Sequence, residues 1–289
     1  MSLRDWVERH DVVLFFVLAF LLSWSIWPLM LLNPDSSPMV PFGPLLAALV
    51  LTAVVGGWRG VVSLLKPVGR WRVHPVWYVV ALLGPFLVAG LSGAAAVLMG
   101  GAPAPGWGVY SDLPGLAASI VSTMLIIGLF EEPGWRGYAL PRMQRNHSAL
   151  WAALVLGVVW ALWHLPEMLG DPGEREPVPY VLSVVAQSVI LAWVYNSTRG
   201  SLLLVIIFHG AMNTAAKYLL PEFGGDSRLV AWWSYAAFWA LAAGAVVAAA
   251  GAERLTTSLP GGETAEDRTP DGRTPKPSHG WARRGGHPS

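Results

Sequence analysis

The sequence contains no cysteine and few charged residues, and both shortages narrow what the chain can be. Without cysteine the chain can form no disulfide, no thiol nucleophile and no thiolate metal site. Only 13% of its 289 residues are charged, whereas 54% are hydrophobic, which is too apolar for an ordinary soluble domain. A net charge of +1 gives no reason to expect binding to nucleic acid. The composition therefore predicts an integral membrane protein surrounded by a lipid bilayer.

Long apolar runs recur along the chain, and about 20 such residues cross the ~30 Å hydrocarbon core of a bilayer as a helix. We expect an all-α, polytopic protein with about eight transmembrane helices, because a helix pairs its own backbone groups inside lipid. The second run is short and begins with Pro41, so it is the weakest candidate for a transmembrane helix. The expected spans are 12–32, 41–56, 76–99, 114–131, 150–168, 179–197, 201–220 and 229–250.

Basic residues predict the orientation, because the cytoplasmic loops of bacterial-type membrane proteins collect lysine and arginine. With both termini in the cytoplasm, the outer loops contain only Arg175, Lys217 and Arg228 before the tail. The inner loops and segments contain Arg4, Arg9, Arg59, Lys66, Arg70, Arg72, Arg136, Arg142, Arg145, Arg199 and Arg254. We therefore expect a multi-pass protein of a bacterial plasma membrane with cytoplasmic N- and C-termini.

Two other segments differ from the apolar runs. Residues 58–74 mix basic and aliphatic side chains, which suits either a segment lying on an anionic inner leaflet or a plain cytoplasmic loop. After residue 251 the chain is rich in glycine, proline, threonine and acids, and it has too few aliphatic residues to bury a core. The composition predicts a transmembrane domain over 1–255 and a disordered polar tail over 256–289.

A few polar side chains interrupt the apolar runs, and they are the candidates for function. Placing an ionisable group at membrane depth costs roughly 2.5–3.5 kcal/mol or more of free energy. Such a group therefore usually has a function. A lone histidine or asparagine in a span could instead form a hydrogen bond between helices. Three spans carry such groups, and turning them toward one cavity avoids exposing them to lipid. The candidates are Glu131, Glu132, Arg136, His164, His209 and Asn213.

The two glutamates are neighbours and therefore point in different directions on a helix. Glu132 lies four residues before Arg136 and can pair with it, provided that the helix continues through Pro133. Glu131 has no such partner, so its carboxyl group is available to act as a general base or acid. With His164 nearby, the two could share a water and activate it toward an amide carbonyl.

The remaining candidates suit the other half of an acyl-transfer reaction. His209 and Asn213 are four residues apart and so share one helix face. Both can donate hydrogen bonds to the oxyanion of a tetrahedral intermediate, which stabilises the transition state of acyl transfer. The pattern therefore predicts hydrolysis of a peptide bond in a membrane-associated peptide or protein.

Straight helices of the expected length would hold Glu131 and His164 apart. At ~1.5 Å per residue, Glu131 lies toward the inner side of its span, whereas His164 falls near the outer end of its own. Either the fourth span continues through Trp135 toward Leu140, or the stretch around Pro166 turns inward. The sequence is compatible with both arrangements.

The order of these motifs resembles that of the CPBP family, which includes CAAX prenyl endopeptidases and bacteriocin-processing or self-immunity (ABI) proteins. The resemblance covers about residues 120–215 and implies an intramembrane endopeptidase with a CAAX-protease-like helical core. It implies Glu131 and His164 as the water-activating pair, Glu132 and Arg136 as the supporting pair, and His209 and Asn213 as the oxyanion-stabilising pair. Trp160 stands where the family usually has phenylalanine, which we expect to alter the shape of the pocket. The matching strings are Glu131-Glu132-x-x-x-Arg136, Trp160-x-x-x-His164, His209-x-x-x-Asn213 and the segment 196–202, Asn-Ser-Thr-Arg-Gly-Ser-Leu.

The same residues allow other functions. Glu131, His164 and His209 would also suit a catalytic zinc with an open position for water. We favour a reaction without a cofactor, because Asn213 is a poor zinc ligand and a good hydrogen-bond donor. A non-catalytic membrane immunity or scaffold protein could use the polar cluster as a structural lock. A transporter would be expected to show an internal repeat, and the two halves of the sequence show none. The sequence leaves the oligomeric state open.

Overall fold

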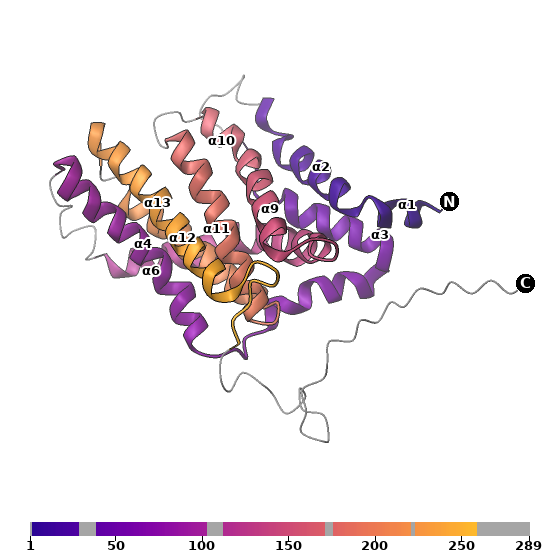
Figure 1. The fold of residues 1–289 in the computed structure, drawn as a ribbon. Helices are drawn as coiled ribbons and strands as arrows, with labels where there is room; N and C mark the ends of the chain where they lie inside the picture. Colours follow the sequence, from indigo (N-terminus) through magenta and orange to yellow (C-terminus); the bar gives the residue numbers. More distant parts are fainter. Residues whose placement is uncertain (1, 29–38, 103–111, 171–175, 221–222, 259–289) are drawn as a thin grey trace, which may run out of the picture. The chain divides into compact units, whose positions relative to one another are not determined.

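The computed structural model describes residues 2–28, 39–102, 112–170, 176–220 and 223–258, and its regular elements in these ranges are all helical (Figure 1). The all-α fold class is therefore confirmed. In chain order the helices are α1 (Leu3–Arg9), α2 (Asp11–Trp24), α3 (Gly43–Leu65), η2 (Lys66–Gly69), α4 (Val76–Gly100), α6 (Leu113–Thr123), η3 (Met124–Gly128), α7 (Leu129–Glu132), η4 (Pro133–Ala139), α8 (Leu140–Met143), α9 (Ala149–Trp163), α10 (Leu165–Gly170), α11 (Pro177–Ser197), α12 (Leu202–Leu219) and α13 (Gly225–Ala250).

Among the described residues, 6 helical stretches are long and apolar enough to cross a membrane. The protein is therefore a multi-pass membrane protein. The helices α2 and α9 are apolar but shorter, and they occupy the places of the expected first and fifth spans, so the predicted number of eight stays a prediction. The long stretches are Gly43–Gly69, Val76–Gly100, Leu113–Met143, Pro177–Ser197, Leu202–Leu219 and Gly225–Ala250.

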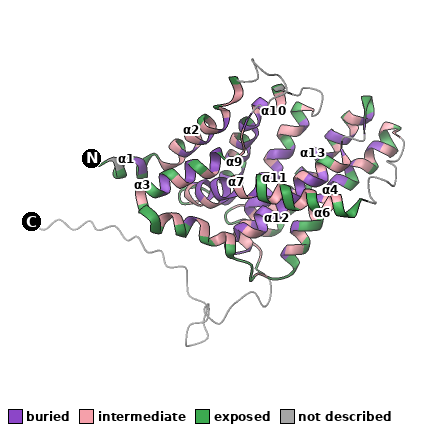
Figure 2. Ribbon diagram, turned by 180° about the vertical axis from the view of Figure 1, so that it is seen from behind, coloured by how far each residue is buried: buried purple, intermediate pink, exposed green. Residues whose placement is uncertain are grey.

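Exposed apolar side chains cover the outer faces of the bundle, as a surrounding bilayer requires. Leu21 in α2 is 64% exposed and Leu98 in α4 is 84% exposed. A soluble protein rarely leaves such side chains in contact with water over large contiguous patches. Buried residues instead gather along α9, α11 and α12 and around α7 (Figure 2).

The helix α3 is longer than the expected second span and bends at one residue. Gly57 has a φ of 57°, in a region that glycine adopts without steric cost. Residues 58–65 continue as helix after this bend, and η2 extends the helical segment to Gly69. A plain loop over 58–74 is therefore wrong for 58–69. Contact of this segment with an anionic leaflet stays a prediction.

The fourth span continues far beyond its expected end. The stretch Leu113–Met143 is 31 residues long and helical throughout, which answers the question that the sequence left open about Leu140. Two of its segments, η3 and η4, are π-helical and flank the two glutamates. Such segments are rare and often occur at functional sites. Arg136 lies inside this stretch and is fully buried, whereas its predicted side of the membrane stays a prediction.

Glycines allow this fourth span to approach its neighbours closely. A Cβ atom on Gly128 would lie 3.0 Å from the backbone oxygen of Ile206 in α12. One on Gly134 would lie 2.5 Å from the backbone oxygen of Pro44 in α3. Neither approach leaves room for a side chain. The glutamates between these glycines are thereby held close to both α3 and α12, and α12 carries His209.

Residues 251–257 fold back onto the bundle. The backbone oxygens of Ala252 and Glu253 accept hydrogen bonds from the backbone N–H groups of Leu150 and Ala149, which otherwise lack partners at the start of α9. Thr257 accepts a hydrogen bond from the Trp193 indole. The rest of the predicted disordered tail, from residue 259 on, lies outside the described residues.

Candidate active site

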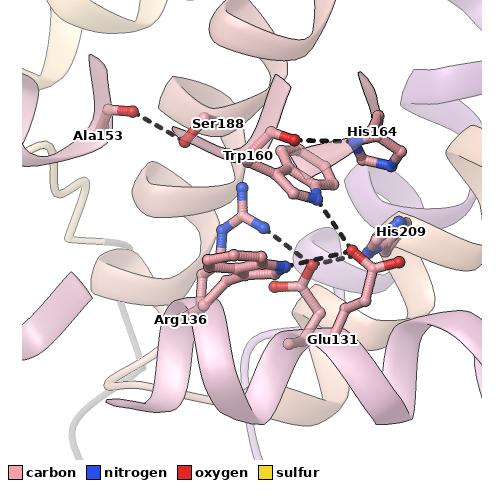
Figure 3. Close-up of polar contacts among 9 residues, drawn as sticks. Glu131, Arg136, Ala153, Trp160, His164, Ser188 and His209 are labelled. Atoms are coloured by element: carbon pink, nitrogen blue, oxygen red, sulfur yellow. Dashed lines mark hydrogen bonds and ion pairs between the residues drawn. The ribbon is translucent and has the colours of Figure 1, made fainter. Parts of the chain in front are cut away.

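A cavity of about 430 Å³ opens inside the bundle, and all four predicted catalytic side chains line it. Glu131 comes from α7, His164 from the end of α9, and His209 and Asn213 from α12. Figure 3 shows Glu131, His164 and His209 gathered around the indole of Trp160. The expectation that polar groups of three spans face one cavity is therefore confirmed, whereas their catalytic roles stay a prediction.

The carboxylate of Glu131 is held by two tryptophans. Its Oε2 accepts a hydrogen bond of 2.9 Å from Trp160 Nε1 and one of 3.3 Å from Trp135 Nε1. Its Oε1 has no hydrogen-bond partner in the described part of the chain. The side chain is almost fully buried, at 2% exposed. One oxygen is thus fixed and the other is left for a water or a substrate in the cavity.

Glu132 contacts both Arg136 and His209, the two groups of the site that can carry a positive charge. Its Oε1 accepts a hydrogen bond of 2.9 Å from Arg136 Nη1 and lies 2.7 Å from His209 Nδ1. The predicted pairing of Glu132 with Arg136 is therefore confirmed. The guanidinium of Arg136 also stacks on the Trp160 ring, 4.4 Å from its centroid. Because all three groups are buried, each depends on the others to compensate for lost solvation.

The contact with Glu132 restricts what His209 can do. When Glu132 is ionised, it can only accept a hydrogen bond, so His209 Nδ1 must carry the proton. The other nitrogen, Nε2, then has a proton to donate only in the imidazolium form. The proposed oxyanion role of His209 therefore requires a doubly protonated ring, a condition that the sequence could not reveal.

His164 has the complementary arrangement. Its Nδ1 lies 2.8 Å from the backbone oxygen of Trp160, an atom that can only accept, so Nδ1 carries the proton. In the neutral ring Nε2 then carries the lone pair that a base requires. The rings of Trp163 and Tyr180 pack against the imidazole at 4.9 and 5.9 Å between centroids and hold its orientation.

Asn213 lies one turn after His209 and is partly exposed in the cavity. Its side chain forms no hydrogen bond within the described residues. An amide at this depth without a partner is available to a polar group of a substrate. The arrangement suits the predicted oxyanion role.

Sequence reasoning missed two residues of the site. Trp160 was expected to change only the shape of the pocket, but its indole donates to Glu131, which phenylalanine cannot do. Its backbone oxygen also holds His164, so Trp160 connects the two proposed activating residues. Trp135 lies four residues after Glu131, on the same helix face. That spacing could have identified Trp135.

The alternative zinc ligands, Glu131, His164 and His209, line the same cavity but are not placed as a metal-binding group. Within the described ranges, no three side chains of histidine, aspartate or glutamate form a group that could hold a metal ion. Nδ1 of His209 contacts Glu132, and Nδ1 of His164 contacts a backbone oxygen, so only Nε2 of each ring could bind a metal. The reaction without a cofactor and the zinc alternative both stay predictions.

Comparisons with known proteins match the same part of the chain. Residues 113–215 match the family described as type II CAAX prenyl endopeptidase Rce1-like. The chain is 30% identical over 109 residues to CAAX prenyl protease 2 of Methanococcus maripaludis. The aligned segment covers 35% of this chain and 40% of that protein. It is 21% identical over 117 residues to lysostaphin resistance protein A of Staphylococcus haemolyticus, covering 40% of this chain and 31% of that protein. The chain therefore spans less than half the length of these relatives.

Proposed function

We propose that the chain is an intramembrane endopeptidase of the CPBP group, because residues 113–215 match the Rce1-like family. The observation that carries the proposal is the common cavity of Glu131, His164, His209 and Asn213. A cavity inside a helical bundle can admit a water and a peptide segment while lipid is excluded. These are the requirements of peptide hydrolysis at membrane depth.

In the proposed reaction a water lies between Glu131 Oε1 and His164 Nε2. Glu131 accepts a proton as the water oxygen bonds to the carbonyl carbon of the substrate, and His164 orients the water through its lone pair. The carbonyl oxygen becomes an oxyanion, which Asn213 Nδ2 and the Nε2–H of the His209 imidazolium stabilise. When the C–N bond breaks, Glu131 returns its proton to the leaving amine.

Glu132 and Arg136 act as positioning residues in this proposal. Glu132 holds His209 in the orientation and protonation state that the oxyanion requires, through the 2.7 Å contact at Nδ1. Arg136 balances the charge of Glu132 inside the protein. Neither residue lines the cavity, so neither is expected to touch the substrate.

We propose a membrane-associated peptide or protein as the substrate. One relative is named for prenylated CAAX substrates, but the cavity residues alone do not require a prenyl group. The other relative is named for resistance to lysostaphin, which favours keeping a non-catalytic immunity or scaffold protein as the second candidate function. Loss of cleavage without loss of folding on changing Glu131 distinguishes the two.

The test uses purified chain in detergent with two probes, a farnesylated CAAX peptide and an N-palmitoylated peptide without a prenyl group. Mass spectrometry of the products should reveal cleavage of at least one of them at a defined bond. Membrane peptidomes of cells with the wild-type chain and with Glu131→Gln should differ in the same products. Intact probes together with identical peptidomes would contradict an endopeptidase.

Chelation tests the proposal that no metal takes part. We expect cleavage to continue at the wild-type rate after incubation with 1,10-phenanthroline, because the described histidines and carboxylates form no metal-binding group. A zinc peptidase incubated in the same detergent buffer serves as the control for chelation. Inhibition that added zinc reverses would instead support the alternative zinc enzyme.

We also propose that the protein lies in a bacterial plasma membrane with both of its termini in the cytoplasm, because its basic residues gather on one side of the predicted spans. The absence of cysteine makes a direct test possible. We expect a membrane-impermeant maleimide to label Asp226→Cys in intact cells, and Asn146→Cys only after permeabilisation. Both positions are exposed, so access to the reagent depends on the side of the membrane. The reverse pattern would show the opposite orientation.

A further inference from the structure

Exposed basic side chains gather at one end of the bundle, where the chain passes from η2 to α4 beside the start of α12. The helix η2 packs against α12, and the loop 70–75 follows it. None of these basic residues lines the active-site cavity, and the proposed reaction gives them no role. The four exposed residues, which we call the basic surface, are Lys66, Arg70, Arg72 and Arg199.

Hydrogen bonds from the segment before α12 hold the loop in place. Ser201 Oγ donates a hydrogen bond of 2.6 Å to the backbone oxygen of Arg70, and it also caps the start of α12. Arg199 Nη2 donates a hydrogen bond of 3.4 Å to the backbone oxygen of Arg72. These bonds use the backbone of the loop, and Arg70 and Arg72 remain exposed. The segment 196–202, which the proposed reaction does not use, therefore positions the basic surface.

The segments that carry these cations contain no acidic residue. Residues 36–111 and 177–221 include all four cations but neither aspartate nor glutamate. Within the described part of the chain, Lys66, Arg70 and Arg72 form no ion pair. Neighbouring charges of one sign repel one another and attract a partner of the opposite sign. The chemistry that complements this surface is therefore anionic.

The position of the basic surface identifies that partner as a lipid bilayer. The loop 70–75 connects Gly43–Gly69 with Val76–Gly100, two stretches long and apolar enough to cross a membrane. It therefore lies at the depth of the lipid headgroups. Trp71 is 60% exposed between two arginines, and tryptophan is enriched at this depth. The backbone oxygen of Trp71 accepts a hydrogen bond of 2.7 Å from the Tyr78 hydroxyl, so this part of the loop is fixed as well.

We propose that the basic surface binds the headgroups of anionic phospholipids, with Arg70 and Arg72 on the phosphate oxygens. Guanidinium groups match the geometry of a phosphate and can donate two parallel hydrogen bonds to it. A basic residue beside a membrane helix strengthens binding to an acidic lipid surface by about fivefold. The sequence left open whether residues 58–74 contact such a surface, and the fixed loop favours contact at 66–72. This inference is independent of the proposed endopeptidase.

The test uses the purified full chain in a non-ionic detergent and two lipids with identical acyl chains, dioleoyl phosphatidylglycerol and dioleoyl phosphatidylcholine. Native mass spectrometry during titration gives an affinity for each lipid. We expect the wild-type protein to prefer phosphatidylglycerol by at least about 25-fold, and Arg70→Gln/Arg72→Gln to lower this preference by about 5- to 25-fold. Arg70→Lys/Arg72→Lys keeps both charges and should retain most of the preference.

The matched control is Arg4→Gln/Arg145→Gln, which removes two exposed cations that each pair with a carboxylate. It should keep the wild-type preference for phosphatidylglycerol. Every variant should unfold at the wild-type temperature, because the hydrogen bonds that fix the loop accept at backbone oxygens. Equal affinity of the wild-type protein for the two lipids would overturn the proposal. So would a preference that Arg70→Gln/Arg72→Gln retains, or an equal loss in the control, which would attribute the preference to net charge alone.

The salt dependence provides a second measurement that needs no variant. Raising ammonium acetate from about 50 mM to about 500 mM should weaken binding of phosphatidylglycerol and leave that of phosphatidylcholine unchanged, because salt screens exposed charges. A preference that does not depend on salt would contradict an electrostatic site. Cleavage of the peptide probes is measured separately, so failure of the lipid site and failure of the endopeptidase are distinguishable.

Discussion

Glu131→Gln should lower kcat/KM for peptide cleavage by about 10²- to 10⁴-fold, the usual contribution of a general base. Glutamine has nearly the same shape, and its Oε1 can still accept hydrogen bonds from Trp135 and Trp160. It cannot take a proton from water. The change also removes a charge that is 2% exposed, so we expect no loss of folding stability from it.

The measurement combines cleavage kinetics with thermal unfolding in the same detergent. Glu131→Asp restores the carboxylate but shortens the side chain by one methylene, so partial activity should return. Glu8→Gln is the control for charge removal, because Glu8 lies on α1 in an exposed ion pair with Arg4. A folded Glu131→Gln protein that cleaves at the wild-type rate would exclude Glu131 as the base and would favour the scaffold function.

The candidate site could be predicted from sequence because its residues are rare in apolar surroundings. Histidine and asparagine inside a span stand out against lipid-compatible neighbours, and each of His164, His209 and Asn213 does line the cavity. The spacing of Glu132 and Arg136 also predicted their ion pair. Residue type and helical spacing therefore carry most of the information about this site.

Hydropathy predicted the wrong end for the fourth span, where buried charges compensate one another. It ended the fourth span at the first glutamate, whereas the helix continues to Met143 and buries Arg136 completely. A buried ion pair is tolerated in a helix bundle, but a scale that adds residues one by one counts both charges as penalties. The expected end of the fourth span was wrong for this reason.

Hydrogen bonds between residues that are distant in the sequence could not be predicted from it either. The bond from Trp160 to Glu131 joins α9 to α7 and depends on the π-helical segments that flank the glutamates. A π-helical segment changes the direction in which later side chains point. The sequence gives no signal for these segments, so the face that each glutamate presents had to come from the structure.

Arg136→Met should destabilise the bundle by about 3–5 kcal/mol, the cost of removing one partner of a buried ion pair. The substitution leaves Glu132 buried without its guanidinium partner, and it removes the cation stacked on Trp160 at 4.4 Å. Among the described residues, His209 would remain as the only positively chargeable group in contact with Glu132. Activity should fall with stability, because Glu132 positions His209 for the oxyanion.

The chain contains its own control for this prediction. Arg4 and Glu8 form an ion pair with the same four-residue spacing and the same 2.9 Å distance, but their side chains are 64% and 46% exposed, against 0% for both Arg136 and Glu132. Arg4→Met should therefore cost less than about 1 kcal/mol. Unfolding of both variants would be followed by tryptophan fluorescence during titration with a denaturing detergent. Adding Glu132→Gln to Arg136→Met should recover part of the loss, because no unpaired carboxylate is then buried. Equal stability of Arg136→Met and the wild-type protein would show that burial does not make this pair different from the exposed one.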